Sequence, residues 1–314
     1  MHFWNAETAP LPSPLMTDLG YDGRVAIITG AGGGLGREHA LLLASRGAQV
    51  VINDLGGAKD GSGGSAGPAE TVAKEIEALG GVAVSDTNSV ATAEGGAAIV
   101  QTALDAFGKV DIVINNAGIL RDKTFHNMDA AMVDAVIDVH LKGAFFVTRP
   151  AWITMREQGY GRIVNTSSNS GILGNFGQAN YGAAKMGLVG FTRVLAAEGA
   201  KYNIKVNALA PVARTRMTED LLGAFAEKLD PAQVTPVVAW LAHEDVPVTG
   251  EVYSCGGGHV ARIFTGVTPG YTDVENLTVE DIRDNFDQIR NTDGYIVPAN
   301  LTEELQATLT ALGG

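Results

Sequence analysis

Short apolar stretches alternate with longer stretches of helical periodicity along most of the chain. Stretches such as "VAIIT" and "VDIVIN" are continuously apolar, which is typical of strands buried on both faces of a sheet. Between them, apolar residues recur at roughly helical spacing, which indicates amphipathic helices. We expect strands at Val25–Thr29, Gln49–Asn53, Val82–Ser85, Val110–Asn115, Arg162–Thr166, Ile204–Leu209 and around Glu251–Ser254, and helices at Leu35–Arg46, Ala69–Leu79, Ala93–Phe107, Met128–Gln158 and Ala179–Tyr202.

This alternation predicts an α/β fold: a Rossmann-type, doubly wound, seven-stranded parallel sheet with helices on both faces. It occupies residues 21–258. Residues 1–20 hold three Pro and little periodicity, so we expect an extended N-terminal arm. Residues 259–314 form a helical C-terminal extension, in which "NLTVEDIRDNFDQI" predicts one amphipathic helix with Thr278 as N-cap and Asp281 as its capping-box partner.

Composition and charge narrow the function classes. The formal net charge of −13 argues against a nucleic-acid partner, because such proteins need a basic face. A single cysteine excludes a disulfide framework. No apolar run approaches the ~20 residues that cross a bilayer, and neither end of the sequence is typical of a signal peptide or an organelle address. We therefore expect a cytoplasmic protein with a small-molecule substrate. The histidines show no metal-ligand spacing, and we predict no metal.

A nucleotide site is indicated by "VAIITGAGGGLGREHALLLA", an apolar strand, a glycine-rich turn and a helix. Such a turn lets the backbone approach a pyrophosphate at the helix start, although a plain tight turn is the alternative. The next strand ends in Asp54, eighteen residues after Gly36, where a carboxylate meets the adenosine ribose hydroxyls of a dinucleotide. A carboxylate there repels the extra phosphate of NADP, and no Arg or Lys follows at once. These features favour NAD.

A second glycine-rich segment, "LGGAKDGSGGSAGP", follows Asp54 directly. Its composition is typical of a flexible surface connection. We interpret residues 55–68 as a mobile loop without a role.

A candidate catalytic pair lies in "QANYGAAKMG", where Tyr181 and Lys185 are four residues apart. On a helix they share a face, as ordinary neighbours also do. The order "TGAGGGLG", "NNAG", Ser168 and "YGAAK", with the serine thirteen residues before the tyrosine, resembles the short-chain dehydrogenase/reductase family. The resemblance covers residues 21–258 and implies hydride transfer between a carbinol carbon and nicotinamide.

Within this resemblance, Tyr181 is the general base that takes the hydroxyl proton. A free tyrosine has a pKa near 10, and we expect the Lys185 ammonium and a positive nicotinamide to lower it. Ser168 fixes the reacting oxygen, whereas strand alternation turns Ser167 away. The implied cofactor contacts are Gly30, Gly34, Leu35, Gly36, Asp54, Asn88, Ser89, Val90, Asn116, Ala117, Gly118, Tyr181, Lys185, Pro211, Val212 and Thr215.

The sequence departs from the family pattern at three places. His140 stands where the family usually has an Asn, and it either holds a water that relays protons from Lys185 or packs within its helix. Asn88 stands where an Asp often faces the adenine. Pro211-Val212 replaces the usual Pro-Gly, and the following "ARTRM" is one residue shorter than the common form, so Thr215 matches the family's carboxamide contact less closely.

The segments "NNAGILRDKTF", "VHLKGAFFVTRPAW" and "GNFGQANYGAAKMGLVGF" resemble the (3R)-hydroxyacyl-CoA dehydrogenase unit of the peroxisomal multifunctional β-oxidation enzyme. That resemblance implies NAD-dependent oxidation of a (3R)-3-hydroxyacyl-CoA, with a steroid side-chain CoA ester or a hydroxysteroid as further candidates, and a homodimer or tetramer. Arg121, Lys123, Arg214 and Arg216 are candidates for CoA phosphates or ordinary solvated charges. The alternatives are an NADPH-dependent 3-ketoacyl reductase of fatty-acid synthesis, which Asp54 disfavours, and a nucleotide sensor without catalysis.

Overall fold

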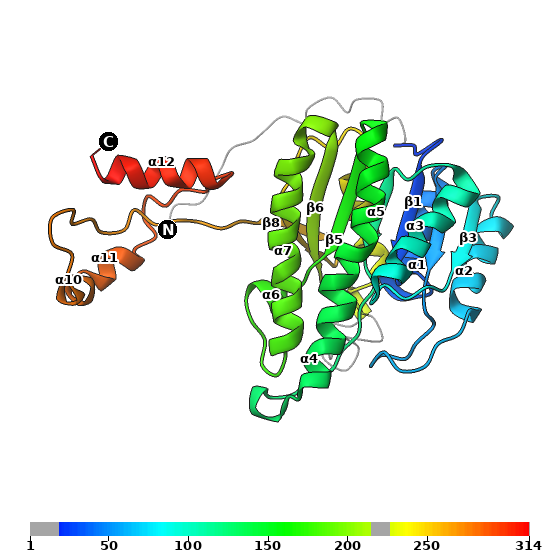
Figure 1. The fold of residues 1–314 in the computed structure, drawn as a ribbon, viewed down its shortest axis with the longest axis horizontal. Coiled ribbons are helices and arrows are strands. Elements are labelled where there is room, and N and C mark those ends of the chain that lie inside the picture. Colours follow the sequence, from blue (N-terminus) through cyan, green and yellow to red (C-terminus); the bar gives the residue numbers. More distant parts are fainter. Residues whose placement is uncertain (1–18, 215–226, 314) are drawn as a thin grey trace.

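The structure is a computed structural model that describes residues 19–214 and 227–313. Its centre is one eight-stranded sheet in the order β3-β2-β1-β4-β5-β6-β7-β8 (Figure 1). The strands from β1 to β7 run parallel, and β8 pairs antiparallel with β7. The strands are β1 Val25–Thr29, β2 Gln49–Asn53, β3 Val82–Asp86, β4 Ile112–Asn115, β5 Gly161–Thr166, β6 Ile204–Pro211, β7 Val252–Gly256 and β8 His259–Ile263.

The doubly wound architecture is confirmed, but the expected number of seven strands is wrong. The eighth strand, β8, lies in the segment that the sequence assigned to the helical extension. The division of the chain at residues 20 and 258 stays a prediction. The described α-helices are α1 Gly34–Ser45, α2 Gly67–Ala78, α3 Ala93–Phe107, α4 Ala130–Ile137, α5 Gly143–Gln158, α6 Asn169–Ile172, α7 Ala179–Gly199, α9 Thr235–Ala242, α10 Val279–Asp284, α11 Phe286–Arg290 and α12 Leu301–Ala311.

Helices cover both faces of the sheet, and successive residues of each central strand face opposite layers. In β1, Ala26 and Ile28 pack with α1, α2 and α9, whereas Val25 and Ile27 pack with α3, α5 and α7. All five residues of β1 are buried. A strand buried on both faces needs an unbroken apolar sequence, which is the pattern that predicted it.

The helix expected over residues 128–158 is interrupted. A π-helical turn, η2 (Asp138–Lys142), separates α4 from α5 and contains the buried His140. Turns of this kind place one extra residue in a helix and are frequent at functional sites. The helix expected around residue 282 is also divided, into α10 and α11, although its capping box between Thr278 and Asp281 is present.

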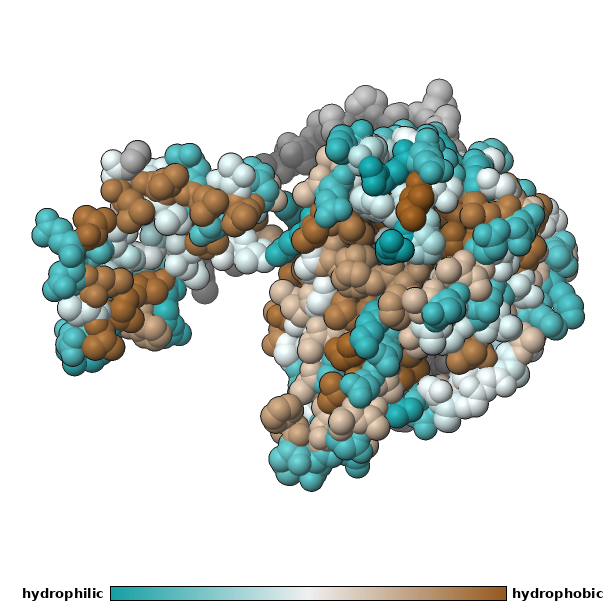
Figure 2. Space-filling model, in the orientation of Figure 1, coloured by the Kyte–Doolittle hydropathy of each residue, from teal (hydrophilic) through white to brown (hydrophobic). Residues whose placement is uncertain are grey.

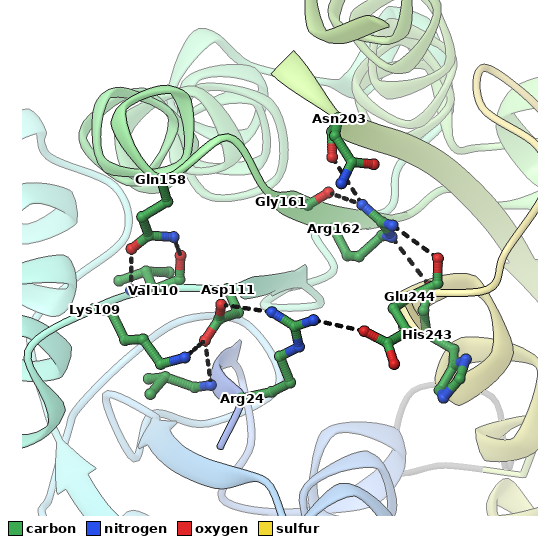
Figure 3. Close-up of polar contacts among 11 residues, drawn as sticks. Arg24, Lys109, Val110, Asp111, Gln158, Gly161, Arg162, Asn203, His243 and Glu244 are labelled. Atoms are coloured by element: carbon green, nitrogen blue, oxygen red, sulfur yellow. Dashed lines mark hydrogen bonds and ion pairs between the residues drawn. The ribbon is translucent and has the colours of Figure 1, made fainter. Parts of the chain in front are cut away.

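A polar network holds together the amino ends of the central strands (Figure 3). Arg162 is 1 % exposed, and its guanidinium donates to the carbonyls of Gly161, Asn203, His243 and Glu244 at 2.8 to 3.0 Å. These bonds compensate the cost of burying the charge. The opposite end of the sheet, where the parallel strands finish, is therefore the end left free for a binding site.

The C-terminal extension stands away from the body and carries α10, α11 and α12 (Figure 1). Its first part is tied to the body, where Arg193 donates to Thr265 at 3.0 Å. Further out it exposes apolar side chains, visible as brown patches in Figure 2. On α12 these include Leu301, Leu305 and Leu309, which lie one helical turn apart and so share a face.

Candidate active site

A cavity of about 380 Å³ opens at the carboxyl ends of the strands. It runs from the turn after β1 to the start of α7, so it joins the glycine motif to the candidate catalytic pair. Parallel α/β sheets bind ligands at this edge, where the strand order reverses. The predicted site residues that line the cavity are Gly30, Gly34, Leu35, Asp54, Asn116, Gly118, His140, Ser168, Tyr181, Lys185 and Pro211.

The turn after β1 is shaped by close backbone contacts. Gly30 has φ +65°, and a Cβ there would lie 2.8 Å from the Ala117 Cα. A Cβ on Gly36 would lie 2.3 Å from the carbonyl oxygen of Gly30. Gly36 therefore allows the tight turn, although it does not itself line the cavity. Helix α1 begins at Gly34 without a side-chain cap. Its first amide groups and dipole remain available for an anion such as a pyrophosphate.

The "NNAG" segment holds this turn in place. The Asn116 side chain donates to the carbonyls of Thr29 and Gly30 at 3.0 and 3.1 Å. The Thr29 hydroxyl accepts hydrogen bonds from the backbone amides of Asn116 and Ala117. Thr29 was not singled out from the sequence, although it lies within the quoted glycine motif. Part of the role expected for Asn116 as a cofactor contact is therefore structural.

Asp54 lies between the glycine turn and the segment after β2. One of its carboxylate oxygens accepts the Gly32 amide at 2.9 Å, and the other accepts the Gly56 amide at 2.7 Å. A Cβ on Gly32 would lie 2.8 Å from the Asp54 Cγ, so glycine is required for this approach. The carboxylate is thereby fixed at the rim of the cavity, where it presents negative charge.

A second cavity of about 250 Å³ adjoins the first beyond Asp54. Asn88, Ser89, Val90 and Ala117 line it, as expected for the adenine end of a dinucleotide. The residue that organises this wall is Asp86, which accepts bonds from the side chains of Asn53 and Asn88 at 2.7 and 2.8 Å. The only sequence signal for Asp86 is its position at the end of a strand.

Ser168, Tyr181 and Lys185 meet at the far end of the first cavity. Ser168 follows β5 and hydrogen-bonds Tyr181, which lies in the first turn of α7. Lys185 lies one turn further along α7, and its Nζ donates to the Thr166 carbonyl at 2.5 Å. The Ser167 hydroxyl points instead toward the α7 backbone, where it donates to the Lys185 carbonyl at 2.8 Å. Ser168 thus comes from the turn after β5, and Tyr181 and Lys185 come from α7. The bond from Lys185 to Thr166 joins α7 to the end of β5.

Burial dominates the proton affinities of the pair. It lowers the pKa of Lys185 to about 7, because a buried ammonium loses its hydration. Burial also raises the pKa of Tyr181, and the hydrogen bond with Ser168 acts in the opposite direction. The Lys185 ammonium was expected from the sequence to lower the tyrosine pKa. In the structure burial raises the pKa of Tyr181, and the contribution that lowers it comes from Ser168.

His140 is pinned beside the pair. Its Nε2 lies 2.7 Å from the Ile119 carbonyl oxygen and 3.0 Å from the Ile119 amide, and its ring meets that of Tyr181 edge-on at 5.2 Å. Burial, followed by the Lys185 charge, holds the pKa of His140 well below its usual value, so the ring is neutral near pH 7. Within the part of the chain that the structure describes, its Nδ1 has no hydrogen-bond partner.

The end of β6 and the residues directly after it lie beside the first cavity, and their role as cofactor contacts stays a prediction. Pro211 lines the first cavity together with Ala213, whereas Val212 pairs with the β7 edge through its amide and the Cys255 carbonyl at 2.8 Å. Thr215, predicted as a cofactor contact, and Arg216 lie outside the described residues.

A dinucleotide fits three features of this site: the glycine-rich turn after β1, the Asp54 carboxylate and the uncapped start of α1. Comparison with known proteins identifies the family. Residues 24–223 match the sequence model of the family described as short chain dehydrogenase. The chain belongs to the short-chain dehydrogenase family. This dehydrogenase is 52 % identical to a Mycobacterium tuberculosis protein named as a short-chain type dehydrogenase/reductase, over 88 % of this chain and 96 % of that protein.

Two further relatives carry more specific names. The hydroxyacyl-CoA dehydrogenase ChsB1 of Mycobacterium tuberculosis is 38 % identical over 79 % of this chain and 81 % of its own length. The structure of full-length peroxisomal multifunctional enzyme type 2 from Drosophila melanogaster superposes with a TM-score of 0.79 at 37 % identity, covering 94 % of this dehydrogenase and 50 % of that chain. This dehydrogenase spans 27 to 66 % of the curated relatives named as peroxisomal multifunctional enzymes or hydratase-dehydrogenase-epimerases.

Residues 19–214 and 227–313 contain no cluster of three or more His, Cys, Asp or Glu side chains that could hold a metal ion. No helix in these ranges is long and apolar enough to span a membrane.

Proposed function

We propose that this dehydrogenase oxidises a (3R)-3-hydroxyacyl-CoA to the 3-ketoacyl-CoA with NAD. The observation that carries the proposal is one continuous cavity, which has Asp54 and the uncapped start of α1 at one end and Ser168, Tyr181 and Lys185 at the other. A cofactor bound along this cavity supplies the hydride acceptor next to a general base.

Three side chains perform the proton chemistry in this proposal. Tyr181 takes the proton of the substrate hydroxyl as the carbinol carbon gives up hydride. Ser168 holds the reacting oxygen against the tyrosine. Lys185, whose Nζ lies 5.5 Å from the centre of the Tyr181 ring, favours tyrosinate whenever it carries its proton. His140 is neutral and positions the loop after β4, so it acts beside the reacting atoms rather than as an acid.

The preference for NAD rests on Asp54. Because amides of Gly32 and Gly56 hold both carboxylate oxygens, the negative charge cannot turn away from a 2′-phosphate. This repulsion counts against the alternative, an NADPH-dependent 3-ketoacyl reductase. Asp54→Ala should therefore lower the preference for NAD over NADP, measured as the ratio of the two kcat/KM values.

The substrate class is supported by the relatives named above, one of which is called a hydroxyacyl-CoA dehydrogenase. One of the four candidates for CoA phosphates, Arg121, is engaged within the protein, where its Nε donates to the Asp60 carbonyl at 3.0 Å. A steroid side-chain CoA ester and a free hydroxysteroid remain substrates to be tested beside a simple acyl-CoA.

The decisive test follows NADH formation at 340 nm. Purified protein receives NAD or NADP with (3R)- or (3S)-3-hydroxyacyl-CoA, or with a 17β-hydroxysteroid, and Tyr181→Phe serves as the matched variant. We expect turnover of the (3R)-thioester with NAD and its loss in the variant. Turnover confined to the steroid would replace the substrate and keep the mechanism, and activity that survives in Tyr181→Phe would refute the assignment of the base.

We also propose that the dehydrogenase is a homo-oligomer. Exposed apolar residues on α5 and α7, such as Phe145, Ile153 and Val194, and on α12 support this, because apolar surface of this kind marks contact sites. Light scattering after size exclusion measures the mass of the particle, and a monomer would contradict the proposal. A cytoplasmic location stays a prediction from the sequence.

A further inference from the structure

The glycine-rich segment after Asp54 is folded upon itself. The Ser65 amide donates to the Leu55 carbonyl at 2.9 Å, and the Ala58 amide donates to the Ser62 carbonyl at 2.8 Å. Gly56 has φ +72°, and a Cβ there would lie 2.0 Å from the Ser65 carbonyl oxygen. Residues 55–65, which we call the strap, therefore have a defined conformation that depends on glycine.

The tip of the strap is bound to the loop that follows β4. The Leu120 amide donates to the Lys59 carbonyl at 3.0 Å, and the Arg121 side chain donates to the Asp60 carbonyl at 3.0 Å. Gly61 approaches Ile119 so closely that a Cβ would lie 3.1 Å from the Ile119 Cδ1. The strap thus crosses from the end of β2 to the end of β4, which are separated in the sheet by β1.

The loop after β4, which binds the strap tip, is also held by residues next to the catalytic tyrosine. His140 holds the backbone of Ile119. The Asn180 side chain donates to the Arg121 carbonyl at 3.1 Å, and Asn180 directly precedes Tyr181. Since these contacts anchor the loop, the contacts at the tip are the ones that can open without disturbing Tyr181.

Both cavities adjoin the strap. Gly56 and Gly57 line the first cavity, and Leu55, Ala58 and Gly61 line the second. We propose that the strap closes over the adenosine half of the bound dinucleotide and that its tip must leave Arg121 before the cofactor can depart. This inference rests on the proposed function. It predicts that Arg121 controls how long NADH stays bound.

The experiment measures NADH release directly. Stopped-flow fluorescence records the dissociation rate constant for the native protein, for Arg121→Met, and for a variant that lacks residues 58–63 and joins Gly57 to Gly64. Arg283→Met, an exposed arginine on α10 in the extension, is the matched control. Loss of one hydrogen bond should speed release about threefold to tenfold, and the control should release NADH at the native rate.

The doubly altered protein separates a tether from a direct contact. If Arg121 acts through the strap, the deletion combined with Arg121→Met releases NADH no faster than the deletion alone. Additive effects would mean that Arg121 contacts the cofactor independently, and the inference would be wrong. Trypsin cleavage after Lys59 gives a readout without turnover, and NADH should slow it. Equal cleavage with and without NADH would also overturn the strap.

Failure of the proposed function is distinguishable from failure of the strap. A native protein that binds no NADH overturns both. A native protein that binds NADH and releases it at the same rate as Arg121→Met and the deletion variant overturns the strap alone.

Discussion

Replacing Lys185 with Met should make the folded protein more stable near neutral pH. The side chain is 3 % exposed, and burial lowers its pKa from 10.5 to about 7. Between these two values the unfolded chain holds a proton that the folded protein has released, so the free energy of unfolding rises with pH. The cost of burial is fully present below pH 7 and disappears as the pH passes 10.5.

The magnitude follows from the two pKa values. Raising the pH from 7 to 9 should stabilise the native protein by about 2 kcal/mol through Lys185 alone. At pH 7 the buried Lys185 costs the native protein about 4 kcal/mol of stability, because the folded protein binds its proton far more weakly than the unfolded chain does. The Met variant avoids this cost, but it loses the hydrogen bond to the Thr166 carbonyl, worth about 1 kcal/mol. At pH 7 the variant should therefore be more stable than the native protein by roughly 3 kcal/mol, while losing activity.

Urea unfolding followed by circular dichroism at pH 7, 8 and 9 measures these differences. Lys74→Met is the control, because the Lys74 side chain is 75 % exposed on α2 and its replacement should leave the pH dependence unchanged. A constant difference between native protein and Lys185→Met across this range would refute the reasoning. So would a native protein that is the more stable of the two at pH 7.

Further predictions use the same unfolding and activity assays. Gly118→Ala should lower the free energy of unfolding by about 1 to 3 kcal/mol, because its Cβ would lie 2.4 Å from the His140 ring. Gly190→Ala, in open space on α7, should raise it by up to about 1 kcal/mol. Arg162→Met should lower it by about 3 kcal/mol, because four backbone carbonyls lose their donor. The kcat/KM for oxidation should rise from pH 7 to 9, since burial raises the pKa of Tyr181 and the base form is required; a flat profile would contradict this assignment.

The sequence predicted the parallel strands well because their signal is local. The expected ranges of β1 and β2 coincide with the observed ones. A strand buried on both faces must be continuously apolar, and this pattern is visible in the sequence. The spacing of the motifs also predicted which residues far apart in the chain belong to one site. Asp54, Ser168 and Tyr181 line the same cavity. Each of these follows directly from a strand end or lies at a helix start, and the fold places those positions on one edge.

Features set by tertiary contacts could not be predicted. The π-helical turn around His140 leaves the apolar spacing of residues 128–158 nearly helical. The group that His140 contacts is the backbone of Ile119, in a loop, and such a contact has no sequence signature. Strand β8 is an edge strand with exposed residues, so it lacks the continuous apolar pattern of the others. The contacts of the strap were also beyond sequence analysis, because glycine content indicates flexibility in an isolated segment but says nothing of contacts such as Arg121 with Asp60.

The loop after β4 connects the two ends of the site. Its first part is held by the Thr29 hydroxyl beside the glycine turn, and its later part is held by His140 and Asn180 beside the catalytic tyrosine. A backbone segment that is hydrogen-bonded on both sides moves as one piece, because each displacement leaves polar groups unpaired. Changes that loosen this loop should therefore alter the affinity for the cofactor and the rate of hydride transfer together, whereas changes at the strap tip should alter cofactor release and leave the rate of hydride transfer unchanged.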